Sequence, residues 1–441
     1  MIINDPSPTR NGSSGDKEPP MKKISLFLLL LPLFLLLSCG SDDDSSPPKP
    51  PVTGNRWTIM IYLDADNDLS SWAMKDVQEM MNVGSTENVT YILQLDLRNV
   101  PTRRYKVERD SLTLLEEPGE LNMAQGDTLR DFVVSTVRQY PAEHYALIAW
   151  NHGQGWKGTP MVKSMFNDYD NGQFLFYTSN DELARSLAEA QEATGVKLDI
   201  LAIDACSMSV MEAAYEFRDV AGIMVASQEL VSAFGWDYED LFMRLYFFPE
   251  MTPAGLARAM VASFQGYYSR SPYHNQTIAA IALDQKYSSD GQTDMTSLAE
   301  AVNDLALRLT ALMDDPSSRA ATLDLLTAAR AHVRGFEYIY VDLIDFCFLL
   351  EGRTSSVEQT YNKILLAEYH GTAQAGAHGL SIVFFDRSIP AYELVYDPTY
   401  RNFDEASQKG SRIAFINEFN WDEMMHRYYA LQYPDLPNLT P

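Results

Sequence analysis

The chain has 441 residues, of which 46% are hydrophobic and 21% are charged, and its formal net charge at pH 7 is −26. This length and composition are typical of a globular protein with a large buried core. A strongly acidic chain lacks the basic face that binds phosphate groups, which argues against nucleic acid as a partner. The same charge can attract basic substrates, or it can simply keep a secreted protein soluble.

Residues 1–38 are predicted to be an N-terminal extension and targeting segment outside the fold. Two lysines follow Met21, and the apolar run from Ile24 to Leu37 is short for a membrane span, as in a signal peptide. The run leads into Leu-Leu-Ser-Cys-Gly. This stretch resembles the bacterial lipobox, in which the cysteine is lipidated and becomes the first mature residue. We therefore expect lipidation at Cys39, with a plain signal peptide as the alternative.

Residues 39–55 are predicted to form an extended tether after the lipidated cysteine, because serine, aspartate and proline dominate and cannot bury a core. Three aspartates directly follow Ser41. This acidic run is similar to signals that send some Gram-negative lipoproteins to the outer face of the outer membrane. The sequence thus predicts a protein anchored to the outer membrane by lipid, on its periplasmic or cell-surface face.

Between residues 56 and 250, short apolar runs alternate with helical patterns, which predicts an α/β core with a doubly wound, mostly parallel sheet flanked by helices. The predicted strands are Trp57–Leu63, Val89–Leu95, a hairpin over Tyr105–Leu115, Ala221–Ser227, and two runs that end just before His152 and Cys206. The predicted helices are Leu69–Val83, Asp127–Gln139, Asn180–Ala193 and Ser207–Phe217. In such folds, ligands and chemistry lie at the carboxyl edge of the parallel strands.

The runs before His152 and Cys206 carry the candidate chemistry. Adjacent parallel strands would place the imidazole and the thiol at one sheet edge, within reach of each other, as a cysteine hydrolase requires. Cys206 would also stand at the start of the helix predicted after it, whose dipole favours a thiolate. A lone cysteine is more often a small buried hydrophobe, so the histidine at the end of a second strand is what favours a nucleophile.

Residues 251–441 are predicted to form a mainly helical region packed on the core. The predicted elements after Gln228 are helices at Asp237–Leu245, Pro253–Tyr268, Ser297–Met313, Ser317–Ala331 and Val357–Glu368, and strands at Thr277–Leu283 and Gly379–Phe385. Cys347 falls within an apolar pattern and is assigned to the core.

Four stretches of the chain carry a family resemblance. They are Trp-Thr-Ile-Met-Ile-Tyr-Leu-Asp-Ala-Asp-Asn-Asp-Leu at 57–69, Trp-Asn-His-Gly-Gln-Gly-Trp at 150–156, Ile-Asp-Ala-Cys-Ser-Met at 203–208 and His-Gly-Leu-Ser-Ile at 378–382. The sequence resembles the clostripain family of cysteine peptidases, in the clan that also holds caspases, legumains and gingipains. The resemblance implies a caspase-like α/β core and cysteine endopeptidase activity.

The resemblance also implies roles for residues at the matching positions. Cys206 would attack the scissile carbonyl and form an acyl-enzyme, and His152 would protonate the leaving amine and then assist water. The backbone N–H of Gly153 would face the oxyanion. In this clan the pair acts as a dyad without a required third residue, and the chemistry requires no cofactor.

Clostripain-like enzymes cut after arginine and sometimes lysine, so the resemblance implies protein or peptide substrates with basic residues. Asp204 is the candidate for the acid at the floor of the specificity pocket, where a buried carboxylate can pair with a guanidinium. The alternative is that Asp204 only caps the following helix. Gln228, Glu229 and Asp237 follow the next strand and are further candidates for lining the same pocket.

An acidic loop follows the first predicted strand. It begins like an EF-hand, but Leu69 stands where glycine is needed and Lys75 where the bidentate glutamate should be, so it is not one. Clostripain itself depends on calcium, which leaves Asp64, Asp66 and Asp68 as candidates for a possible Ca²⁺ site. Structural turns and helix caps are the favoured interpretation of these acids.

Some family members are processed by cleavage after a basic residue between the catalytic histidine and cysteine. Lys157 and Lys163 lie in that interval and are candidates for self-cleavage. Two alternatives to a basic-specific peptidase stay open. One is a catalytically silent, lipid-anchored binding protein on a peptidase scaffold, against which the intact pair argues. The other is a peptidase of the same clan with non-basic specificity, against which Asp204 argues.

Overall fold

The computed structural model of the protein describes residues 54–156, 165–168, 174–176, 182–336, 339–352, 355–385, 400 and 411–433. The predicted targeting segment and nearly all of the predicted tether therefore lie outside the described residues. Within the part of the chain that the structure describes, no helix is both long and apolar enough to cross a bilayer.

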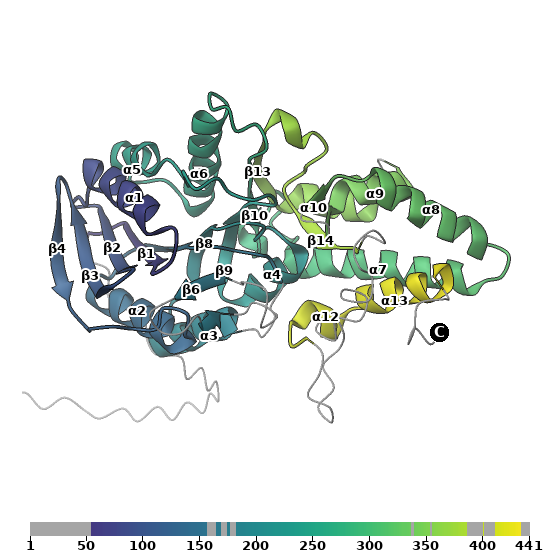
Figure 1. Ribbon diagram of the computed structural model, residues 1–441, viewed down its shortest axis with the longest axis horizontal. Helices are drawn as coiled ribbons and strands as arrows, with labels where there is room; N and C mark the ends of the chain where they lie inside the picture. The colour runs from purple at the N-terminus through teal and green to yellow at the C-terminus, as the bar shows by residue number, and fades with distance from the viewer. Residues whose placement is uncertain are drawn as a thin grey trace, which may run out of the picture. The chain divides into compact units, whose positions relative to one another are not determined.

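Within the described residues, a nine-stranded sheet runs in the order β13-β10-β9-β8-β5-β1-β2-β3-β4 (Figure 1). Its parallel strands are β9 (Ala221–Ala226), β8 (Leu198–Asp204), β5 (His144–Trp150), β1 (Trp57–Ala65) and β2 (Val89–Leu97). Antiparallel strands β10 (Thr277–Ala282) and β13 (Leu365–His370) extend one side, and β3 (Val100–Glu108) and β4 (Ser111–Glu116) extend the other. The predicted α/β fold with a mostly parallel sheet is confirmed.

The central strands are buried on both faces, which explains their near-continuous apolar sequences. In β1, the side chains of Ile59, Ile61 and Leu63 enter one core, and those of Met60 and Tyr62 enter the other. The first core is closed by α1 (Ser70–Val83), α5 (Tyr238–Phe247) and α6 (Pro253–Tyr268), and the second by α2 (Gly126–Gln139), α3 (Glu182–Thr194) and α4 (Met211–Glu216) (Figure 1).

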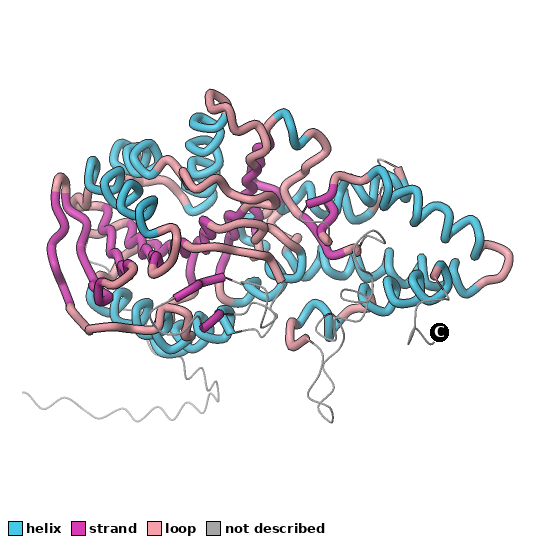
Figure 2. Tube along the Cα trace, in the orientation of Figure 1, coloured by secondary structure: helices cyan, strands magenta, loops and turns pink. Residues whose placement is uncertain are grey.

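The sheet continues past residue 250, where the sequence analysis placed a regional boundary, because β10 pairs with both β9 and β13. The C-terminal half is mainly helical (Figure 2). Its further helices are α7 (Met295–Asp314), α8 (Arg319–His332), α9 (Leu343–Glu351), α10 (Ser356–Ile364), α12 (Ala414–Glu418) and α13 (Trp421–Gln432). A small sheet holds β11 (Gly335–Phe336), β12 (Tyr340–Asp342) and β14 (Ser381–Val383). The short elements are β6 (Met165–Asp168), β7 (Phe174–Phe176), η2 (Phe217–Asp219), η3 (Gln285–Tyr287) and η4 (Thr372–Gln374).

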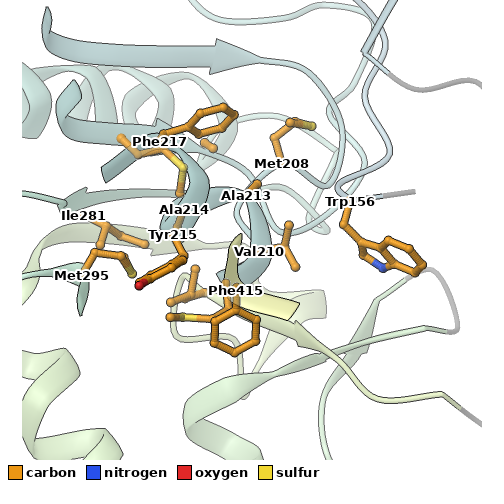
Figure 3. Packing of buried hydrophobic residues seen from close by; sticks show 14 of the residues in the cluster. Trp156, Met208, Val210, Ala213, Ala214, Tyr215, Phe217, Ile281, Met295 and Phe415 are labelled. Atoms are coloured by element: carbon orange, nitrogen blue, oxygen red, sulfur yellow. The ribbon is translucent and has the colours of Figure 1, made fainter. Parts of the chain in front are cut away.

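Helix α4 connects the sheet to the C-terminal half. Its Ala213, Ala214 and Tyr215 share a buried cluster with Met295 of α7 and Phe415 of α12 (Figure 3). Contacts of this kind exclude water from both sides of a short helix and make its position depend on the elements around it. The chain that leads from β8 into α4 is therefore held between the sheet and the C-terminal helices.

Two predicted helices differ from the structure. The helix predicted over residues 357–368 ends at Ile364, because the residues from Leu365 pair with β10 instead. A strand partner distant in sequence overrides the local helical pattern there. The helix predicted over residues 207–217 begins only at Met211.

Candidate active site

Strands β5 and β8 are parallel neighbours whose register pairs Trp150 with Asp204. His152 and Cys206 each stand two residues beyond this pair in the sequence. Because parallel strands run in the same direction, both residues leave the sheet at its carboxyl edge. The structure therefore brings together the two residues that the sequence singled out.

Gly153 lies against the chain around Cys206. A Cβ atom at this position would overlap the carbonyl oxygen of Cys206 and come within 2.9 Å of the Cβ of Ala205 and 3.0 Å of the Cγ of Met208. Only a residue without a side chain lets the two strand ends approach so closely. The backbone next to His152 is thus in direct contact with the backbone of Cys206.

Cys206 is the accessible thiol of the described part of the chain. It is partly exposed, whereas Cys347 is buried, as predicted for a core residue. Burial raises the pKa of the Cys347 thiol, which keeps that sulfur protonated and unreactive. The N–H of Val231 donates to Sγ of Cys206 at 3.3 Å, so the loop after β9 lies directly over the Cys206 thiol.

Cys206 does not begin a helix, which corrects the expectation from the sequence. Ser207 has a φ of 57°, and α4 begins only at Met211. Positive φ is uncommon for a residue with a side chain and marks a sharp turn here. Because the helix dipole acts mainly within the first turn, α4 is too distant in the chain for the expected effect on the thiol.

His152 is held by two neighbouring side chains. Its backbone N–H donates to Oδ1 of Asn151. Its ring Nε2 lies 3.0 Å from Oδ1 of Asp68, in the loop after β1. Sequence reasoning considered Asp68 only as a metal candidate. The available signal was its position just beyond a strand end, since β1 and β5 reach the same sheet edge.

A pocket of about 260 Å³ opens beside His152 and Cys206. Its other lining residues are Leu69, Trp150, Asn151, Asp204, Ala205, Leu230, Val231, Ser232, Ala233 and Gly235. Apolar side chains and backbone make up most of this wall. A pocket of this composition can take a long side chain with an apolar stem and present a polar group at its end.

Buried Asp204 lines this pocket, and buried Asp76 lies against two of its other lining residues, Trp150 and Gly235. Asp204 accepts a hydrogen bond from the hydroxyl of Tyr238 at 2.9 Å, and Asp76 accepts one from the indole of Trp150 at 2.9 Å. Burial raises the pKa of Asp204 to about 7, and burial together with the neighbouring Asp204 raises the pKa of Asp76 to about 9. A Cβ atom at Gly235 would lie 3.2 Å from Asp76 and 3.3 Å from Asp204. The absence of a side chain at Gly235 therefore leaves space beside the carboxyl groups of Asp76 and Asp204.

Sequence reasoning missed Asp76. This residue is buried on α1 on the same face as Ala73, Val77 and Met80. An acid on the apolar face of an amphipathic helix is unusual, because burying an unpaired carboxylate is costly. That mismatch between charge and helical periodicity was the signal that could have identified it.

The other predicted pocket residues lie elsewhere, which corrects the prediction for Gln228, Glu229 and Asp237. The side chain of Gln228 is buried and donates to Asp342 at 3.0 Å, and Glu229 accepts from the amide of Gln374. Asp237 caps α5 and lines a different pocket of about 640 Å³. The chain after β9 thus turns Gln228 and Glu229 towards the C-terminal half, which the sequence pattern does not reveal.

The three predicted metal candidates separate in the structure. Asp66 joins Glu120 and Asp168 in a group whose carboxylate oxygens lie within 4.8 Å of one another. Asp64 accepts a hydrogen bond from the amide of Asn151, and Asp68 contacts the imidazole of His152. The group around Asp66 is made of hard oxygen donors, which suit calcium.

Asp96 adjoins the group of Asp66, Glu120 and Asp168. It is fully buried, and burial followed by the charges of Glu120, Asp168 and Asp66 raises its pKa to about 8. A bound divalent cation would offset the neighbouring negative charges that raise the pKa of Asp96. The residues present therefore fit a calcium ion.

Three predicted positions remain without a structural account. Cys39, Lys157 and Lys163 all lie outside the described residues. Their predicted roles in lipidation and processing therefore stay predictions from the sequence.

Known proteins resemble this chain in sequence and in fold. The sequence profile of the clostripain family matches residues 61–428. Clostripain of Hathewaya histolytica is 28% identical over 224 residues, which cover 43% of this chain and 42% of that protein. The match thus spans less than half of the length of that relative.

Solved structures show the same fold. An inactive zymogen C11 protease from Parabacteroides distasonis has a TM-score of 0.58 at 20% identity, over 79% of this chain and 97% of that one. A secreted C11 cysteine protease from Bacteroides thetaiotaomicron, in complex with an irreversible peptide inhibitor, has a TM-score of 0.57 at 16% identity, over 77% of this chain and 97% of that one.

The close contact at Gly153 leads to a stability prediction. Gly153→Ala is expected to lower the free energy of unfolding by about 1–3 kcal/mol, because the new methyl group overlaps the carbonyl oxygen of Cys206. The measurement is urea unfolding followed by circular dichroism. Gly266→Ala is the control. Gly266 lies in α6, and a Cβ atom there would meet only the side chain of Arg270, at 3.7 Å. Equal stability of the Gly153→Ala form and the parent protein would contradict the prediction.

Proposed function

The chain belongs to the clostripain family, and on that premise we propose that it is a cysteine endopeptidase that hydrolyses peptide bonds after arginine or lysine. The observation that carries the proposal is the arrival of His152 and Cys206 at one carboxyl edge, beside a pocket that the buried acid Asp204 lines. Protein or peptide substrates with basic residues fit this arrangement.

In the proposed reaction, Sγ of Cys206 attacks the scissile carbonyl carbon, and a C–S bond forms. The thiol proton passes to the imidazole of His152, which delivers it to the leaving amine as the C–N bond breaks. Water then attacks the acyl-enzyme, giving a proton to His152. The C–S bond breaks, the thiol is restored, and the new carboxyl group leaves. The atoms and protons balance without any cofactor.

The negative charge that develops on the carbonyl oxygen needs donors that are already in place. The backbone N–H of Gly153 is the candidate, because this residue packs directly against the chain at Cys206. The lack of a side chain at Gly153 gives the carbonyl group access to the N–H.

Specificity for a basic side chain rests on Asp204. Asp76 lies close to Asp204, and both adjoin Gly235. A guanidinium that enters the pocket would be attracted by Asp204 and would favour its ionised form. A substrate aspartate would meet a like charge, and a substrate asparagine would leave the acid without a counter-charge. The position of Asp204 therefore favours cleavage after arginine or lysine over the non-basic alternative.

The central test uses fluorogenic peptides that end in Arg, Lys, Asp or Asn before the reporter group. We expect the purified full chain to hydrolyse the Arg or Lys peptide, and Cys206→Ala to abolish this turnover. Preferred turnover of the Asp or Asn peptide would overturn the specificity. If every peptide stays intact, also after brief trypsin treatment and with calcium present, the binding-protein alternative replaces the proposal.

The raised pKa of Asp204 predicts a pH dependence. Above about pH 7 the carboxyl group is ionised and attracts the guanidinium, and below it the group is protonated and neutral. The KM for an Arg peptide should therefore rise as the pH falls through 7. Asp204→Asn should lower kcat/KM by about 30-fold or more, which corresponds to about 2 kcal/mol, and should remove this pH dependence.

Asp237→Asn is the matched control for Asp204→Asn. Asparagine keeps the cap of α5, and Asp237 lines the other pocket, so its kcat/KM should stay within about twofold of the parent. A fully active Asp204→Asn form would show that Asp204 does not select basic side chains.

We further propose that the group of Asp66, Glu120 and Asp168, with Asp96 beside it, binds calcium when calcium is present. The donor oxygens lie close enough to share one ion. The ion would offset the mutual repulsion of these acids and stabilise the loops that carry them. The proposed hydrolysis takes no step through the metal.

Calcium should therefore raise the melting temperature relative to a chelator. The effect should be larger at pH 9 than at pH 6, because Asp96, with a pKa of about 8, must lose its proton before it can support a cation. Glu120→Gln should reduce the effect, and Glu117→Gln, whose carboxylate pairs with Arg103, should not. An unchanged melting temperature at pH 9 would overturn the calcium site.

The sequence also supports two proposals about maturation. We propose that Cys39 is lipidated and anchors the protein to the outer membrane, and that self-cleavage occurs after Lys157 or Lys163. Labelled palmitate should enter the parent protein and not Cys39→Ala. A two-fragment pattern should appear in the parent protein and be absent from Cys206→Ala. An unlabelled parent, or the same bands in both forms, would contradict the respective proposal.

A further inference from the structure

We propose that Asp68 is a positioning residue for His152, which makes the site a three-residue arrangement instead of the dyad that the family resemblance implies. Its carboxylate would accept a hydrogen bond from the Nε2–H of the imidazole and so leave Nδ1 to exchange a proton with Cys206. The inference rests on the proposed peptidase function. It concerns how the histidine is held, and Asp68 itself does not touch the substrate.

The sheet explains why Asp68 can reach His152. Strands β1 and β5 are parallel neighbours, and their register pairs Leu63 with Trp150. The residues just beyond both strands therefore emerge side by side at the carboxyl edge. Oδ1 of Asp68 lies 3.0 Å from Nε2 of His152, which is a hydrogen-bonding distance.

The loop that carries Asp68 is tied to the chain next to His152. The amide of Asn151 donates to Oδ2 of Asp64 at 2.7 Å, and the amide of Asn67 donates to Oδ1 of Asn151 at 3.3 Å. Asp64, Asn67 and Asn151 are all almost fully buried. Oδ1 of Asn151 also accepts a hydrogen bond from the backbone N–H of His152. The backbone and the ring of His152 are thus held by one network that begins at the end of β1.

The chemistry of the acceptor determines the tautomer. An ionised carboxylate has no proton to donate, so a hydrogen bond to Asp68 requires that Nε2 carry the proton. Nδ1 then holds the lone pair that can take the thiol proton. The carboxylate also favours the imidazolium that forms during the reaction, as the acid of a Ser-His-Asp triad does.

Exposure sets the size of the expected effect. The side chain of Asp68 is 65% exposed and that of His152 is 26% exposed, so solvent screens the charge interaction. The main contributions of Asp68 are then the orientation and the tautomer of the His152 imidazole, and both affect kcat. We expect a loss well below the about 10⁴-fold effect known for a buried triad acid, on the order of 10- to 100-fold.

The experiment compares Asp68→Ala and Asp68→Asn with the parent full chain on an Arg peptide. Asp68→Ala should lower kcat by roughly 10- to 100-fold and leave KM within about twofold. Asp68→Asn should retain an intermediate kcat, because its carbonyl oxygen can still accept a hydrogen bond from Nε2–H.

Two controls separate this role from a structural one. Asp127→Ala removes a carboxylate that is 76% exposed on α2, and it should leave kcat unchanged. Added formate should restore part of the activity of Asp68→Ala and none of the activity of Cys206→Ala, because a small carboxylate can occupy the vacated position.

The outcomes distinguish the inference from the function on which it rests. If the parent is active, Cys206→Ala is silent, and Asp68→Ala keeps the kcat of the parent, the inference is overturned while the function stands. If the parent shows no turnover that depends on Cys206, the proposed function fails and the inference fails with it. A lower kcat with no formate rescue would assign Asp68 a purely structural role and also overturn the inference.

Discussion

The parallel register of β1, β5 and β8 is the constraint on which the site depends. It pairs Leu63 with Trp150 and Trp150 with Asp204, so three chain segments leave the sheet at the same height. Each segment then contributes one group: Asp68 after β1, His152 after β5 and Cys206 after β8. Backbone hydrogen bonds between strands, together with burial of both sheet faces, provide a rigid base for side chains that stand on loops.

The second constraint is electrostatic. Asp204 and Asp76 are buried close together, and water is excluded from both, so the pKa of each is raised. Such a pair lowers the stability of the folded chain at high pH, and it is tolerated where a ligand supplies the missing positive charge. Gly235 leaves the required space, and the hydroxyl of Tyr238 orients Asp204 towards it. In the proposed function, a basic substrate side chain would supply positive charge beside these two carboxyl groups.

Local patterns predicted the parallel strands well and the ends of two helices poorly. Buried parallel strands have continuous apolar sequences, and this signal is contained within the strand itself. The end of α10 and the beginning of α4 depend instead on distant contacts. Helix α10 ends before Leu365, because the residues from Leu365 pair with β10. Helix α4 begins only at Met211, after the turn at Ser207 with its positive φ, and it packs against the C-terminal helices. No window of neighbouring residues contains that information.

The sequence by itself determined the fold class and the family, and it singled out His152, Gly153 and Cys206 as candidates, because each follows a recognisable strand in a fixed chain order. Only the tertiary structure decided the surroundings of those residues. It placed Asp76 of α1 beside Asp204, brought Asp68 to the imidazole, and turned Gln228 and Glu229 away from the pocket. The physical reason is that strand register and helix packing join segments far apart in the chain, while charge and polarity alone do not indicate which neighbour a side chain will meet.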